Sequence, residues 1–266
     1  MSRLVVCGDS FMTPVTTHPK THFSEIIADN LGYELVAYSR GGMSNGGIAI
    51  QIDTAIKNKA DFILLGTSFH DRIEFAFGTT NRKHFDFTVE DIQYNHRNSI
   101  SSHYPWLNKD PQLISTSLAE ILDSDDHYRR ANFDSCSNPA EKKKAIDNWF
   151  KYLYHEGWKA QTDRWMLYAI LHKLHLSTIP YLFCFDLIGV AETCPWLTNS
   201  VNNVVHNFHS ILHPLTACHE IGYHTTVKQQ QQLADYVFGY HTTVKQQQQL
   251  ADYVLNHIDN TKILHV

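Results

Sequence analysis

A serine near the N-terminus stands where an α/β enzyme could use it as a nucleophile. The apolar run Leu4–Cys7 is typical of a short strand, and Gly8-Asp9-Ser10 follows it directly. Ligands of open parallel sheets bind at the carboxyl ends of the strands. A serine hydroxyl in that position can attack an ester carbonyl when a base lies within hydrogen-bond reach. Ser10 is therefore a candidate site residue at this edge of the sheet.

Two further loops of small and polar residues follow the next two predicted strands. The first contains Gly41, Gly42 and Asn45, and the second contains Thr67 and Ser68. Loops from one edge of a parallel sheet lie near one another, so the three loops together form a candidate site. Acyl transfer is one reaction for such a site, and it requires a serine hydroxyl, a base and hydrogen-bond donors aimed at the developing oxyanion.

Histidine, the remaining requirement, occurs in a segment that the chain contains twice. GYHTTVKQQQQLADYV spans Gly222–Val237 and again Gly239–Val254, with Phe238 between the copies. Each copy offers a loop histidine, His224 or His241, ahead of a helix whose Thr-x-x-Gln start is a capping box. The repeat therefore supplies two candidate bases in identical local settings.

One final helix is enough for the fold, so one copy is surplus, and a tandem duplication explains its origin. The first copy keeps the upstream loop and its acid, Glu220. Because the upstream chain decides where the histidine lies, we favour His224 as the base and keep His241 as the alternative. A short capped helix with little to bury is marginal alone. The surplus copy must dock on the body, dock on a neighbouring chain to form a homo-oligomer, or fray.

The elements that must position these groups alternate between strand and helix. After the first strand, the pattern predicts a helix at 21–32 ending at Gly32, a strand at 33–38, a helix at 48–60, a strand at 61–66, a helix at 163–176 and a strand at 179–187. This order predicts an α/β fold, a three-layer α/β/α sandwich with a mostly parallel sheet.

The stretch from about 76 to 160 breaks this alternation. It is polar, aromatic and irregular, with a helix expected near 142–154. Because it lies between sheet elements, we interpret it as an inserted, cap-like helical region. The chain is then a single domain over residues 1–266, with the insertion in its middle and the duplicated segment at 222–254.

The loops around the predicted site resemble the conserved blocks of the SGNH (GDSL-type) hydrolases. VVCGDSFM is similar to their first block, with Ser10 as nucleophile, and RGGMSN is similar to the second. The second block supplies an oxyanion-hole glycine, here Gly42 with Gly41 as the alternative. LLGTSFHD resembles the third block, and GYHTT fits the place of the family's histidine. The resemblance covers about the first 75 residues and the last 50.

This resemblance implies a flavodoxin-like SGNH fold and a serine esterase that works through an acyl-enzyme without a cofactor. Ser68 would complete the oxyanion hole, although the third block normally has Asn there and a hydroxyl is a shorter donor than an amide. Thr67 or Asn45 are the alternative donors. The segment HTTVKQQ is also similar to a branch of these proteins found in tailed-phage genomes, which would make the gene virus-encoded.

A second departure from the family concerns the acid that orients its histidine. The family has D-x-x-H, whereas Ile221 stands three residues before His224. The nearest acid is Glu220, which we take as the orienting carboxylate. His213, in a His-Pro pair typical of the family's last block, is a further alternative base.

Composition argues against several other kinds of partner. The net charge is −5 and no basic run is longer than Lys142–Lys144, which argues against nucleic acid. No apolar run is long enough to span a bilayer, and the first residues lack the pattern of a signal peptide, so we expect a cytoplasmic protein. His206, His209 and His213 share a predicted helix face but lack a Cys or carboxylate at diagnostic spacing, so no metal is expected.

Two functions follow from these observations. The first is a serine esterase acting on small acyl esters, such as the O-acetyl groups of an acylated glycan. The alternative is a catalytically degenerate SGNH domain that binds a glycan or serves as an assembly module.

Overall fold

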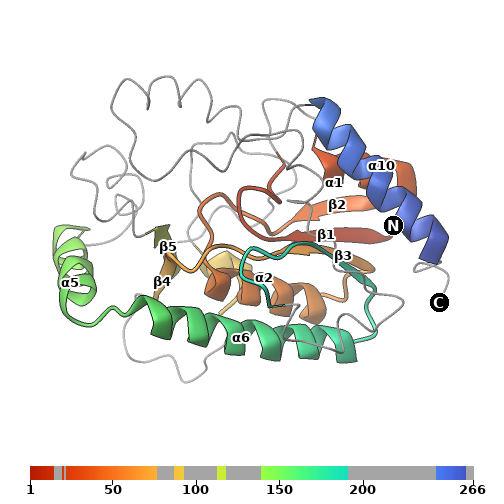
Figure 1. Ribbon diagram of the computed structural model, residues 1–266. Helices are drawn as coiled ribbons and strands as arrows, with labels where there is room; N and C mark the ends of the chain where they lie inside the picture. The colour runs from red at the N-terminus through yellow and green to blue at the C-terminus, as the bar shows by residue number, and fades with distance from the viewer. Residues whose placement is uncertain are drawn as a thin grey trace.

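A four-stranded parallel sheet forms the centre of the protein (Figure 1). The computed structural model describes residues 1–14, 20, 22–76, 87–92, 113–117, 139–190 and 244–261. The strands of this sheet are β1 (Arg3–Cys7), β2 (Glu34–Ala37), β3 (Phe62–Gly66) and β6 (Tyr181–Phe185). They lie in the order β2-β1-β3-β6, and each neighbouring pair is parallel. The carboxyl ends of β1, β2 and β3 therefore meet at one edge, as the sequence predicts.

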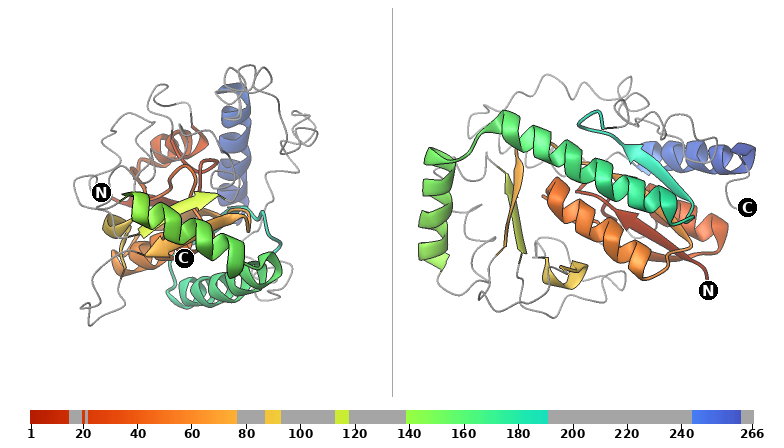
Figure 2. Two further views of the ribbon diagram at one scale, coloured as in Figure 1. Left: turned by 90° about the vertical axis from the view of Figure 1, so that its left-hand side faces the viewer. Right: turned by 90° about the horizontal axis from the view of Figure 1, so that it is seen from below.

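Helices cover both faces of this sheet (Figures 1 and 2). One face carries α1 (Phe23–Leu31) and α10 (Val244–Thr261). The other carries α2 (Asn45–Lys57) and α6 (Glu156–Leu176), which lie side by side. The three-layer α/β/α sandwich with a parallel sheet is thereby confirmed.

Strand residues alternate between two buried layers of side chains. In β1, Leu4 and Val6 pack toward α1 and α10, whereas Val5 and Cys7 pack toward α2 and α6. All five residues of β3 are buried, as expected for a central strand covered on both sides. This double burial explains why the predicted strands read as continuous apolar runs.

Local capping positions the helices beside the site. His22 caps α1 in a capping box with Glu25, and Gly32 ends this helix in the left-handed conformation with φ 66°. Ser44 caps α2, because its hydroxyl accepts a hydrogen bond from the Gly47 N–H. The helix α2 therefore begins at Asn45, directly after the glycine loop and three residues earlier than the sequence pattern indicates.

A second, smaller sheet, which the sequence analysis missed, joins the segment just before the inserted region to a strand within it. Strands β4 (Arg72–Ala76) and β5 (Leu113–Ser117) pair antiparallel, and a short 3₁₀ turn, Val89–Asp91, lies between them in the chain. The expected helix near 142–154 is present as α5 (Pro139–Tyr152). The two strands escaped prediction because neither is a continuous apolar run like the central strands: β4 alternates charged and apolar residues over a short length, and three of the five residues of β5 are serine or threonine.

The last helix, α10, comes from the second copy of the repeat. It begins directly after Thr243 and buries Leu250, Ala251, Val254 and Ile258 against the sheet and α1. The sequence argument gave this place to the first copy, which lies outside the described residues.

The residues that follow each copy give a physical reason for this difference. The second copy continues into a helix that includes Ile258, which is buried. The first copy is followed by Phe238-Gly239, and the residue equivalent to Ile258 is His241. Glycine inside a helix costs about 1 kcal/mol, so only the second copy can extend its apolar stripe without interruption.

None of the described helices is both long enough and apolar enough to cross a membrane.

Substitution by alanine at Gly8 and at Gly32 should lower the free energy of unfolding by different amounts. A Cβ at Gly8 (φ 151°) would lie 2.4 Å from Met12 Cγ, whereas a Cβ at Gly32 would meet nothing within 4 Å. We expect Gly32→Ala to lose about 1–2 kcal/mol of unfolding free energy through its left-handed backbone alone. Gly8→Ala should lose about 1–3 kcal/mol more through overpacking. Urea unfolding checks this, and equal midpoints for the two variants would contradict it.

Candidate active site at the carboxyl edge of the sheet

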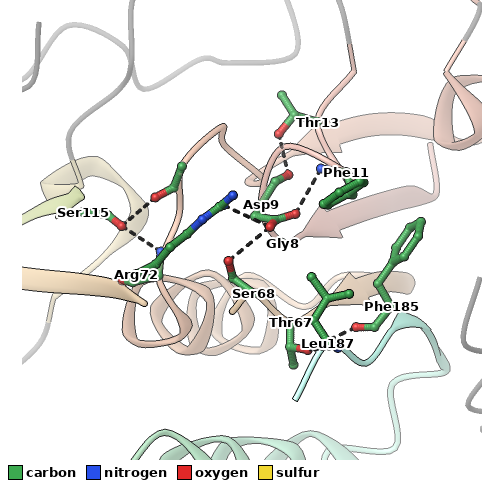
Figure 3. Close-up of polar contacts among 12 residues, drawn as sticks. Gly8, Asp9, Phe11, Thr13, Thr67, Ser68, Arg72, Ser115, Phe185 and Leu187 are labelled. Carbon is green, nitrogen blue, oxygen red and sulfur yellow. Dashed lines mark hydrogen bonds and ion pairs between the residues drawn. The ribbon is translucent and has the colours of Figure 1, made fainter. Parts of the chain in front are cut away.

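Hydrogen bonds join the three loops that the sequence analysis singled out (Figure 3). The Ser68 hydroxyl, after β3, donates to Asp9 Oδ2, after β1, at 3.1 Å. The Ser68 N–H donates to Asn45 Oδ1, at the start of α2, at 2.8 Å. The expected convergence of the loops at this edge is therefore observed.

Ser10 lies in the turn after β1, partly exposed and next to the glycine loop. A Cβ placed on Gly41 would lie 4.0 Å from Ser10 Cβ. Within the described part of the chain, the Ser10 hydroxyl and the N–H groups of Ser10 and Gly42 have no hydrogen-bond partner. A serine hydroxyl and two backbone donors are thus available in adjacent turns.

The turn that carries Ser10 is built around the buried carboxylate of Asp9. Its side chain is 1% exposed and accepts hydrogen bonds from the Phe11 N–H at 3.0 Å and from Ser68. The Arg72 guanidinium of β4 pairs with Asp9 Oδ2 at 3.0 Å (Figure 3). Burial raises the pKa of Asp9, and the charge of Arg72, followed by the hydrogen bonds from Phe11 and Ser68, opposes this rise. The Asp9 side chain therefore holds the turn that carries Ser10 through buried hydrogen bonds and an ion pair.

The donors expected to complete the oxyanion hole are already engaged. Both donor groups of Ser68 have acceptors, and Asn45 Nδ2 donates to Ser68 O and to Asp163 Oδ2 at 2.9 and 3.0 Å. The Thr67 hydroxyl donates to Phe185 O and accepts from the Leu187 N–H, so it ties β3 to the end of β6 (Figure 3). The role predicted for Ser68 stays a prediction, and the backbone donors are the more accessible ones.

Asn45 also contacts a second polar network, through Asp163. Asp163 of α6 is buried and forms an ion pair with Lys159, which also contacts Glu74 at 3.4 Å. His70, in the loop after β3, places Nδ1 3.8 Å from Asp163 Oδ2. Burial lowers the pKa of His70, and the charge of Asp163 partly opposes this. The network links Lys159 and Asp163, in the N-terminal half of α6, to the third loop.

Sequence reasoning did not find the partners of these loops. Asp9 was recognised as part of a motif but not as a buried anion, and Arg72 and Glu74 border a stretch that showed no regular pattern. Asp163 and His70 carried no signal beyond residue type. A weak indication existed in His70-Asp71-Arg72, a cluster of titratable residues at the end of the third block.

Four of the predicted catalytic residues lie outside the described residues. They are the two repeat histidines His224 and His241, the acid Glu220 and the alternative base His213. Among the residues that are described, no group of three or more His, Cys, Asp or Glu side chains could hold a metal ion.

Comparison with known proteins adds no assignment. No protein-family model, curated protein or solved structure matches this chain.

The contact between His70 and Asp163 predicts a measurable titration. Burial disfavours the imidazolium, so His70 should titrate below the usual histidine pKa of about 6.5. Asp163→Asn removes the negative charge that favours the imidazolium, so the pKa should fall further. Asp53→Asn, which removes a charge paired with Lys173 instead, should leave it unchanged. NMR titration, with His70→Gln to assign the signal, tests this; a rise in Asp163→Asn would contradict it.

Proposed function

We propose that this protein is a serine ester hydrolase of the SGNH type, with Ser10 as its nucleophile. The observation that carries the proposal is the position of Ser10, partly exposed at the carboxyl end of β1 and against Gly41. The strand order β2-β1-β3-β6 agrees with a flavodoxin-like sheet, in which this edge binds ligands.

In the proposed reaction, Ser10 Oγ attacks the ester carbonyl while a histidine takes its proton. The N–H groups of Ser10 and Gly42 stabilise the oxyanion, and the alcohol leaves with the proton from the histidine. Water then attacks the acyl-enzyme in the same way and releases the acid. The substrate class we propose is a small acyl ester, such as an O-acetyl group on a glycan.

The placement of α10 bears on which histidine acts as the base. The family's histidine precedes the helix that closes the sandwich, and here that helix is Val244–Thr261 of the second copy. His241 precedes it by three residues, and three residues span at most about 11 Å. The start of α10 is the end of this helix that lies farther from the chain termini (Figure 1). We therefore propose His241 as the base ahead of His224, with His213 as the next alternative.

The competing proposal, a degenerate SGNH domain that binds a glycan or assembles without turnover, has one observation in its favour. The donors of Ser68 and Asn45 are both engaged, so the oxyanion hole depends on backbone groups. Removing one oxyanion donor typically lowers kcat by about 100- to 1,000-fold. This arrangement therefore favours a slow enzyme or none.

A first experiment decides between these two functions. We expect the wild type to hydrolyse p-nitrophenyl acetate and to react with a fluorophosphonate probe, and Ser10→Ala to do neither. Ser177→Ala is the matched control, because Ser177 is partly exposed like Ser10 but lies at the C-terminal end of α6, four residues before the start of β6. A folded wild type without probe labelling, or labelling that persists in Ser10→Ala, would support the degenerate domain.

A second experiment decides between the repeat histidines. We expect His241→Ala to lower kcat by at least about 100-fold, as for a general base, and His224→Ala to change it little. The two substitutions are made in identical local sequences, so each is the control of the other. Loss of activity in His224→Ala alone would restore the first copy as the source of the base. Full activity in both would point to His213.

A further inference from the structure

Along β4, the small sheet of β4 and β5 has one polar and one apolar face. Arg72 and Glu74 alternate with Ile73 and Phe75 along β4, and Ser115 of β5 lies directly opposite Glu74. Residues opposite one another in an antiparallel pair share a face. The side chains of Arg72, Glu74 and Ser115 therefore point the same way.

The apolar face is attached to the helical part of the insertion. Ile73 is buried, and the ring of Phe75 packs edge-on against Trp149 and Phe150 of α5, with centroids 5.4 and 6.2 Å apart. Figures 1 and 2 both show α5 beside this sheet. These contacts give the sheet a support outside the central sandwich.

Each side chain of the polar face reaches a different part of the candidate site. Arg72 pairs with Asp9, next to Ser10. The Ser115 hydroxyl donates to Gly42 O at 2.8 Å and accepts from the Ser44 N–H at 2.7 Å. The Glu74 carboxylate lies against Gly46 in the first turn of α2. A Cβ built on Gly46 would lie 2.4 Å from Glu74 Oε1. The polar face thus contacts the turn that carries Ser10, which we call the nucleophile turn. It also contacts the glycine loop, residues 40–44, and the helix α2 that follows this loop.

We propose that the β4–β5 sheet is a clamp that fixes the nucleophile turn and the glycine loop relative to each other, with Arg72 and Ser115 as positioning residues. This inference rests on the proposed esterase function. Neither residue is required to touch the substrate. Arg72 holds the turn through Asp9, and Ser115 holds the peptide groups on both sides of Met43.

The glycine loop needs an external support for a physical reason. Gly41 and Gly42 have no side chains to pack, and glycine loses more backbone freedom on folding than other residues. Gly42 has φ 75°, a conformation that its neighbours must maintain. An oxyanion donor works when it is already oriented before the reaction, so two hydrogen bonds from Ser115 would act on catalysis through loop geometry.

The test compares Ser115→Ala with Thr54→Ala. Thr54 donates one hydrogen bond to Ile50 O within α2, so its loss removes a similar hydroxyl away from the loops. We expect Ser115→Ala to lower kcat for p-nitrophenyl acetate at least about tenfold with KM within twofold, since displaced catalytic geometry affects the transition state. Thr54→Ala should keep kcat, and Ser115→Thr, which restores the hydroxyl, should recover most of it.

Amide hydrogen exchange supplies a readout that does not depend on turnover. The Ser44 N–H should exchange faster in Ser115→Ala than in wild type or Thr54→Ala, because it loses its acceptor. Unchanged exchange, or equal kcat in Ser115→Ala and Thr54→Ala, would overturn the clamp. A wild type without Ser10-dependent turnover would contradict the esterase instead, and the exchange measurement would then decide by itself whether the sheet orders the loop.

Discussion

The buried carboxylate of Asp9 is the constraint on which the rest of the site depends. Burying a charge is costly unless it is paired and hydrogen-bonded, and Asp9 is almost fully buried. Its partners come from three separate places: the Phe11 N–H of its own turn, Ser68 after β3 and Arg72 of β4. The turn that carries Ser10 can therefore adopt this structure only when all three segments are in place.

The glycine loop depends on the insertion in the same way. Arg40, at the start of this loop, is buried, and its guanidinium donates to the carbonyl oxygens of Val89 and Ile92. Ser115 holds the loop at its other end. A buried guanidinium needs acceptors for its five donors, and backbone carbonyls of the insertion provide two of them. The inserted region is thus part of the construction of the site and not an appendage to it.

The described helix from the duplicated segment shows which copy covers the sheet. The two copies have identical residues over the repeat, so their local propensities are the same. Their continuations differ, and the second copy runs on to Ile258, which packs with Leu250 and Val254 into the layer formed by α1 and the sheet. Most of the stability of a helix comes from packing an apolar face, so the longer stripe is favoured for this place.

Periodicity and turn residues in the sequence determined the sandwich: the central strands, the helix that ends at Gly32 and the three loops at one edge. These features depend on neighbours along the chain, which a sequence displays. The tertiary structure decided that Arg72 and Ser115 support the loops, that Asp163 contacts Asn45, and that the second repeat copy closes the sandwich. Each of these contacts joins residues that are far apart in sequence. Local sequence patterns do not distinguish among the possible partners, and charge pairing and burial in the folded protein determine which contact forms.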